Sequence, residues 1–465
     1  MSMNMFLGLG AEAFEDQPEV PVVETPPVVA APVSEEVIAL IAERDDSDAA
    51  VEVATAGAEI AASVRQIDQY ADAIERIENV QASMEHFMEN GITPKAAAML
   101  HAQINGLYAS MGKGAEGVGS GLESFDNEDT SMAILNAGME ALNSEKASLG
   151  ERIRAAWIGS ADSTNKFFTK WLTRAGALKR RAQNIVKAAQ GKSGSAEVTL
   201  KSRYLTVKGG QASTNLLADI TAFQKFAEDG AARYFKDGGA WLNGELITAV
   251  KKMAAVSTVE EAGKIVDSLK YPGYPGATIA VQDKPAFTIK RTEVVLGGYA
   301  VFDLQYKTTG GSTQPEIIHE LKALGKNRVH VKQAPDEKGK SEFSMSVSAA
   351  DAIAIANAVI KLADIGAHLE KNIKWMDPFT KSILNGANAS RAAMTRNDNA
   401  EKGVAVILDY LARAPTGVFQ SVQSLTWELS QAIFNVADAA LKVANKVAKT
   451  SESGEAAGGS EPATA

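Results

Sequence analysis

The 465-residue chain contains no cysteine, which excludes disulfides and thiolate metal sites. Aromatic residues make up only 6% of it, and together with the abundant alanine this favours helices that pack through small side chains. The first residues lack the basic and long apolar regions of a secretory signal. No run of about 18 apolar residues occurs, so we expect no membrane-spanning helix. The length and composition predict a soluble chain of two or three domains.

Motifs that would support catalysis are incomplete. Gly191–Ser193 matches the end of a phosphate loop, but the first glycine of that loop would stand at Val186. His319 begins an H-E-x-x-H pattern whose second histidine is replaced by Ala323, and the five histidines show no metal-ligand spacing. We therefore predict a non-enzymatic protein with no metal, no cofactor and no small-molecule substrate.

Charge is divided unevenly along the chain. Residues 1–151 contain six Lys/Arg and 27 Asp/Glu, a net charge of −21, whereas residues 152–465 contain 41 Lys/Arg and 30 Asp/Glu, a net charge of +11. Such asymmetry indicates an acidic arm joined to a body that tolerates polyanions.

Changes in pattern along the chain predict its organisation. Helical periodicity dominates, and alternating strand-like segments occur only between about residues 198 and 348. The fold class expected is α+β, mainly helical, with a mostly antiparallel sheet in the central body. The predicted regions are 1–33, a disordered Pro- and acid-rich segment; 34–160, an acidic helical propeptide-like region; 161–197, a basic amphipathic helix and linker; 198–348, a mixed α+β domain; 349–449, a helical C-terminal region; and 450–465, a disordered tail.

A seven-residue apolar repeat runs from Val53 to Met88. Val53, Ile60, Ile67, Ile74 and Met88 share one grid, which Gln81 interrupts. The pattern fits a coiled-coil seam for self-association, and it fits equally an amphipathic helix packed on its own domain. Both interpretations stay open on sequence grounds.

The segment Ser163–Lys192 has eight basic residues and no acidic one. It could neutralise phosphates and stack aromatic rings on nucleic-acid bases, lie on an anionic membrane, or dock on the body with a solvated basic face. The nucleic-acid-binding candidates are Lys166, Lys170, Arg174, Lys179, Arg180, Arg181, Lys187 and Trp171.

A tripeptide of a small residue (Gly, Ala or Ser), any residue and Glu, here called the small-x-Glu motif, occurs thirteen times. Eleven copies end at or before Glu197 and two lie in the C-terminal tail, while none of the twelve glutamates between residues 198 and 449 completes the motif. The segment "GKSGSAE", at 191–197, is thus either a linker or a cleavage site. The candidate sites are cleavage after Glu197, our first choice, after Glu140, our second, and after Glu123, Glu116 or Glu12.

An acidic arm, a basic remainder and small-x-Glu motifs confined to the ends resemble the internal head proteins of the phiKZ-like giant tailed phages. The resemblance is carried by motifs such as Gly10-Ala11-Glu12, Gly138-Met139-Glu140 and Ser195-Ala196-Glu197, so it covers the first 197 residues and the tail. It implies a structural protein of the capsid interior, made in the host bacterial cytoplasm. It also implies removal of an N-terminal propeptide by a phage prohead protease.

The partners that the resemblance implies are the prohead protease, other inner-head or capsid proteins, and packaged DNA. Two other classes compete with it. One is a scaffold or binding protein that self-associates through Val53–Met88. The other is a membrane-active effector that uses the basic amphipathic helix at Ser163–Lys192.

Overall fold

A computed structural model describes residues 35–110, 128–308, 310–334, 342–396 and 401–450. The α-helices are α1 (Glu35–Asn90), α2 (Pro94–Ser110), α3 (Glu128–Ala189), α4 (Leu216–Lys225), α5 (Ala231–Ala240), α6 (Ile247–Lys252), α7 (Val259–Asp267), α8 (Gln314–Lys326), α9 (Ala349–Ile373), α10 (Met376–Thr395), α11 (Lys402–Leu411) and α12 (Thr416–Thr450). The strands are β1 (Ser195–Lys201), β2 (Ile279–Asp283), β3 (Phe287–Arg291), β4 (Tyr299–Tyr306), β5 (Arg328–Gln333) and β6 (Glu342–Ser348).

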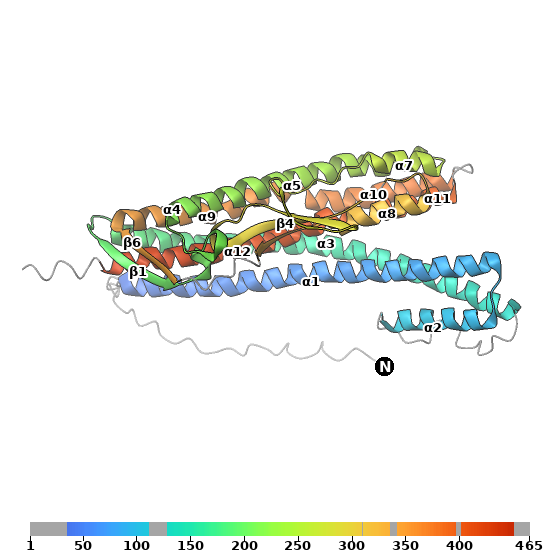
Figure 1. Cartoon of the computed structure of the whole chain (residues 1–465), viewed down its shortest axis with the longest axis horizontal. Coiled ribbons are helices and arrows are strands. Elements are labelled where there is room, and N and C mark those ends of the chain that lie inside the picture. The colour runs from blue at the N-terminus through green and yellow to red at the C-terminus, as the bar shows by residue number, and fades with distance from the viewer. Residues whose placement is uncertain (1–34, 111–127, 309, 335–341, 397–400, 451–465) are drawn as a thin grey trace, which may run out of the picture.

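The molecule is elongated, and long helices run along it (Figure 1). The C-terminal helix α12 packs against α1, α3 and α9, and α3 in turn packs against α1 and α9. The first and last helices of the chain therefore share one hydrophobic core.

Two small antiparallel sheets complete the α+β fold and confirm the predicted class. One sheet pairs β1 with β6, and the other has the order β2-β3-β4-β5. The outer strand β5 lies against α12, whose side chains accept hydrogen bonds from it. The amide of Val329 donates to Ser421 Oγ at 3.0 Å, and the amide of Val331 donates to Glu428 Oε2 at 2.7 Å. These bonds satisfy edge-strand donors that would otherwise be free to pair with another chain.

The apolar repeat of α1 is used inside the chain. Val53, Ile60, Ile67 and Ile74 are buried against the common core, and the interrupting Gln81 is buried too, where it donates to Asn143 Oδ1 at 2.9 Å. The interpretation of a helix packed on its own domain is therefore correct. Self-association through this seam is the wrong prediction, because α3 and α12 already cover it.

The sequence predicts a helix stop at Glu89–Gly91 and a new helix with Thr93 as its N-cap, and the structure has this stop and start. Gly91 has a positive φ of 83°, Thr93 Oγ1 accepts from the amide of Ala96, and Pro94 opens the helix.

Two predicted breaks are absent. The boundary expected between residues 160 and 161 falls inside α3, which is continuous for 62 residues. Ser160 and Thr164 signal a loop by composition, but both are buried and accept hydrogen bonds from Gln423 of α12. These residues therefore form an interface with α12 within an unbroken helix.

The sequence also predicts separate helices at about Asn215–Tyr234 and Ala240–Ala255, with a break between them. Instead, α4, α5 and α6 form one continuous rod through two π-helical segments, Phe226–Gly230 and Trp241–Leu246. Gly238 and Gly239 are buried within this rod, where they allow close packing and do not make a turn. The predicted linker at 191–197 is also shorter than expected, because β1 begins at Ser195.

Residues 349–394 form the single helical stretch, within the described parts of the chain, that is long and apolar enough to span a membrane. Length and composition alone define this stretch, so it leaves the expectation of no membrane-spanning helix unchanged. More than half of its most apolar window, 56%, is buried in the protein, as in the core helices of globular proteins.

Tryptophan rings fit against glycines of neighbouring helices. A Cβ atom at Gly57 of α1 would overlap the indole of Trp427 of α12. Gly366 of α9 has the same relation to Trp171 of α3. In α5, Gly239 lies under Trp375, whose Nε1 donates to the carbonyl of Phe235 at 3.0 Å. Glycine thus sets how closely these helices approach.

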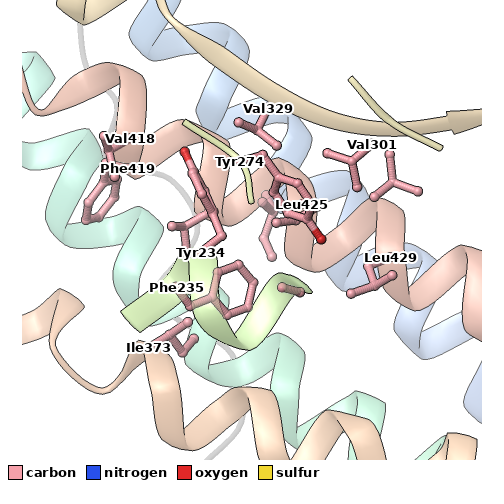
Figure 2. Packing of buried hydrophobic residues seen from close by; sticks show 14 of the residues in the cluster. Tyr234, Phe235, Tyr274, Val301, Val329, Ile373, Val418, Phe419, Leu425 and Leu429 are labelled. Atoms are coloured by element: carbon pink, nitrogen blue, oxygen red, sulfur yellow. The ribbon is translucent and has the colours of Figure 1, made fainter. Parts of the chain in front are cut away.

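The core beneath the sheet contains a buried carboxyl group. Figure 2 shows Tyr234 and Phe235 of α5 near Phe419 of α12, with Val301 and Val329 of the sheet close by. Asp303 of β4 is 2% exposed and accepts from the Tyr274 amide at 2.8 Å and from Gln305 Nε2 at 2.7 Å. Burial raises the pKa of Asp303, and these two hydrogen bonds offset part of that effect.

We expect Gly57→Ala to lower the free energy of unfolding by about 1–3 kcal/mol, because the new methyl group collides with Trp427 in a packed core. Urea unfolding followed by circular dichroism measures the change. Gly150→Ala in α3 is the matched control, because its Cβ meets no atom within 4 Å; alanine there should raise stability by up to ~1 kcal/mol. Equal effects of the two variants would contradict the close α1–α12 contact.

We expect Asp303→Asn to remove one contribution to the pH dependence of stability. A raised pKa means that folded Asp303 binds its proton more tightly than unfolded Asp303, so the wild type loses stability as pH rises through the folded pKa. Asparagine does not titrate and keeps an oxygen acceptor. Its stability relative to the wild type should therefore increase from acid to neutral pH in parallel denaturation series. A constant difference between the two proteins would contradict a raised pKa.

Candidate functional site: the basic segment and the cleavage motifs

The basic segment Ser163–Lys192 forms the C-terminal half of α3, and its apolar side lies in the core. Phe167, Phe168 and Trp171 are each 0% exposed. The rings of Phe168 and Trp171 stack with centroids 5.3 Å apart, and Phe434 of α12 closes on the other side of Trp171 at 6.1 Å. The helix is therefore docked on the body, and burial excludes the base-stacking role predicted for Trp171.

Most of the cationic candidates on this helix contact groups of the same chain. Three are paired with carboxylates of other helices: Lys170 with Glu52 of α1 at 2.8 Å, Lys179 with Asp364 of α9, and Arg181 with Asp438 of α12 at 3.2 Å. Lys166 pairs with Asp162 one turn earlier at 2.7 Å, and the guanidinium of Arg174 lies 4.1 Å from the ring centre of Phe434. Arg180 and Lys187 are exposed. The segment is thus mainly a structural element with internally matched charge.

An acidic stripe on α1 was not anticipated as a site. Its members are four carboxylates that make ion pairs with the body: Glu52 with Lys170, Asp68 with Arg328 at 2.7 Å, Glu75 with Lys326 at 2.9 Å, and Glu78 with Lys146, Lys322 and Arg413. Asp68, Glu75 and Glu78 are spaced by seven and three residues, which places them on one helical face. That spacing is the sequence signal that could have identified the stripe.

The pKa of Glu75 is lowered by the cations that face it. Its partial burial would raise the pKa, but the hydrogen bond and charge of Lys326, with the charge of Lys322, lower it overall. Glu75 therefore stays ionised against the cations of the body.

Two of the candidate cleavage sites lie in regular elements. Glu197 is exposed in the middle of β1, in register with Ser346 of β6. Glu140 is exposed on α3. Glu12, Glu116 and Glu123 lie outside the described residues. Among the described residues, no group of three or more His, Asp or Glu side chains is placed to hold a metal ion.

We expect Trp171→Ala to destabilise the protein by about 3–5 kcal/mol, because it removes a fully buried aromatic side chain. Thermal and denaturant unfolding measure the loss. Lys166→Ala, on the exposed side of the same helix, is the control and should change stability little. A Trp171→Ala protein as stable as the wild type would contradict the docked helix.

A comparison with family models matches residues 45–446, which span the fold from the first half of α1 to the end of α12. The matching model is that of the phiKZ-like phage internal head proteins. No curated protein and no solved structure matches the chain. Because the match covers most of the chain, this protein belongs to the family of phiKZ-like phage internal head proteins.

Proposed function

We propose that this chain is a non-enzymatic structural protein of the capsid interior, made in the bacterial cytoplasm as a precursor. We further propose that the phage prohead protease removes only residues up to the first turn of α1, by cleavage after Glu12 or another small-x-Glu motif of the first 36 residues. Membership of the internal head family supports the location. The packing of α1 into the common core is the observation that supports the position of the cut.

The apolar seam of α1 contributes heavily to stability. Val53, Ile60, Ile67, Ile74, Ile77 and Met84 are all at most 2% exposed. Burial of a large aliphatic side chain contributes roughly 1.5–3 kcal/mol, so these six together contribute on the order of 10 kcal/mol. The entropy cost of ordering α1 offsets part of this gain, but removal of the helix would also expose the apolar faces of α3 and α12 that it covers. Loss of α1 would therefore lower the stability of the rest of the fold.

Cleavage further along the chain is less compatible with a folded product. A cut after Glu140 would divide α3, and a cut after Glu197 would divide β1 and break the chain connection to the helix that carries Phe167 and Trp171. A cut after Glu116 or Glu123 would leave α1 held by its seam and its ion pairs. Our first two choices from sequence, Glu197 and Glu140, are therefore replaced in this proposal by Glu12.

The charge of the retained body also bears on its partners. A product that begins at Val37 contains 47 Lys/Arg and 50 Asp/Glu, a net charge of −3, and one that begins at Ala13 contains 47 Lys/Arg and 56 Asp/Glu, a net charge of −9. An acidic body with paired cations would not be drawn to DNA by overall charge. We therefore propose that other inner-head proteins are its main contacts, and that any contact with packaged DNA is local.

The mature N-terminus in purified virions tests the proposal. Intact-mass and N-terminal peptide mass spectrometry should find a chain that begins at Ala13, Asp16 or Val37, the residues after Glu12, Glu15 and Glu36. Such a product keeps α1 and the shared core. Glu12→Gln should abolish the Ala13 terminus if that motif is the one cleaved.

Two results would contradict the proposal. A start at Met1 or Ser2 would show that no N-terminal propeptide is removed. A start after Glu116, Glu123, Glu140 or Glu197, with no N-terminal fragment retained, would show that the fold tolerates the loss of α1.

A further inference from the structure

The carboxylate of Glu78 lies among three cations from different parts of the chain. Lys146 Nζ of α3 is 2.9 Å from Glu78 Oε1, and Arg413 Nη1, in the turn between α11 and α12, is 3.3 Å from the same oxygen. Lys322 Nζ of α8 is 3.5 Å from Oε2. One carboxylate therefore faces three positive charges.

An aromatic ring forms the floor of this cluster. The cationic groups of Lys146, Lys322 and Arg413 lie 6.0, 5.3 and 5.4 Å from the ring centre of Tyr410, which is 8% exposed. Cation–π attraction and the buried ring hold the three positive groups close together despite their mutual repulsion. The cluster is thus an assembled receptor for negative charge.

The charges in this receptor are not balanced. Glu75, one turn earlier on α1, pairs with Lys326, so the two carboxylates face the four cations Lys146, Lys322, Lys326 and Arg413. The excess of two positive charges is partly open to solvent, because the side chains of Lys146, Lys322 and Arg413 are 21%, 25% and 26% exposed. An anion from solution can reach them.

We propose that Lys146, Lys322 and Arg413 on the ring of Tyr410 form a phosphate-binding site, which Glu78 fills when no phosphate group is present. A phosphate group offers more acceptor oxygens than a carboxylate, and arginine binds such groups through paired N–H donors. Exchange requires only that the Glu78 side chain turns away, so α1 stays in place. The site is therefore independent of where the precursor is cut.

Phosphate rescue of full-length Glu78→Ala tests the site. Removal of the carboxylate leaves three cations without their common partner, so the melting temperature should fall. Inorganic phosphate should then restore it along a saturable curve, because a bound ligand stabilises the folded state by mass action. A 12-nucleotide DNA used in a parallel series distinguishes the backbone phosphates of nucleic acid from free phosphate as the source.

Three controls separate site binding from general salt effects. Sodium chloride at equal ionic strength corrects for screening, and the wild type corrects for the nonspecific stabilisation that phosphate salts give. Glu52→Ala is the matched variant on the same helix, because Glu52 pairs with Lys170 outside the cluster. The site is supported if the melting temperature of Glu78→Ala rises along a saturable curve. Half of that rise should occur at a phosphate concentration at least tenfold lower than any effect of phosphate on the wild type or the control variant.

Adding Lys322→Ala and Arg413→Ala to Glu78→Ala should abolish the rescue. If Glu78→Ala does not fold, Glu78→Gln keeps the side-chain volume, and phosphate should then protect Lys146 and Lys322 from amine acylation measured by mass spectrometry. Rescue that is absent, linear in phosphate, or retained in the triple variant would overturn the proposal. None of these results depends on the mature N-terminus, which tests the proposed processing separately.

Discussion

The contact between the first helix and the last helix is the constraint on which the other parts of this structure depend. Helix α12 is surrounded by α1, α3, α9 and β5, and it contributes buried polar groups as well as apolar ones. Gln420 Nε2 donates to the carbonyl of Val64 on α1, and Gln423 binds Ser160 and Thr164 on α3. Because buried polar groups require partners, these bonds fix the rotation of three helices at once. The chain ends cannot be separated without opening the core.

This constraint gives the uneven charge distribution a role within the fold. Four carboxylates of α1 lie against cations of α3, α8, β5 and the α11–α12 turn. The acidic N-terminal region and the basic remainder are thus complementary surfaces of one folded body. Ion pairs at such exposure add little stability individually, but a carboxylate facing the wrong surface would leave cations unpaired. The charge pattern therefore determines which face of α1 packs on the body more than how strongly α1 is held there.

Local patterns in the sequence predicted those parts of the structure that depend on near neighbours. The α1 stop at Gly91, the α2 start at Pro94 and the six strand segments follow from turn chemistry and alternation. The sequence did not determine which helix packs on the α1 seam, because a seven-residue repeat identifies an apolar face and not the element that covers it. The continuity of α3 through Ser160 was missed because its stabilising partner, Gln423, is 263 residues away. The burial of Trp171 and the acidic stripe were missed because they too depend on distant partners.

Charge pairing within the fold also limits what the surface can do in a compartment filled with nucleic acid. Nonspecific binding to DNA grows with the number of phosphates that free lysines and arginines neutralise. Carboxylates of this chain pair with four of the eight cations of the basic segment Ser163–Lys192, which reduces that number. The Glu78 cluster differs because three cations share one carboxylate and face solvent at 21–26% exposure. Internal pairing lowers the charge that the basic helix can offer to DNA, and the Glu78 cluster is the position proposed for a phosphate contact, whose geometry the core already holds.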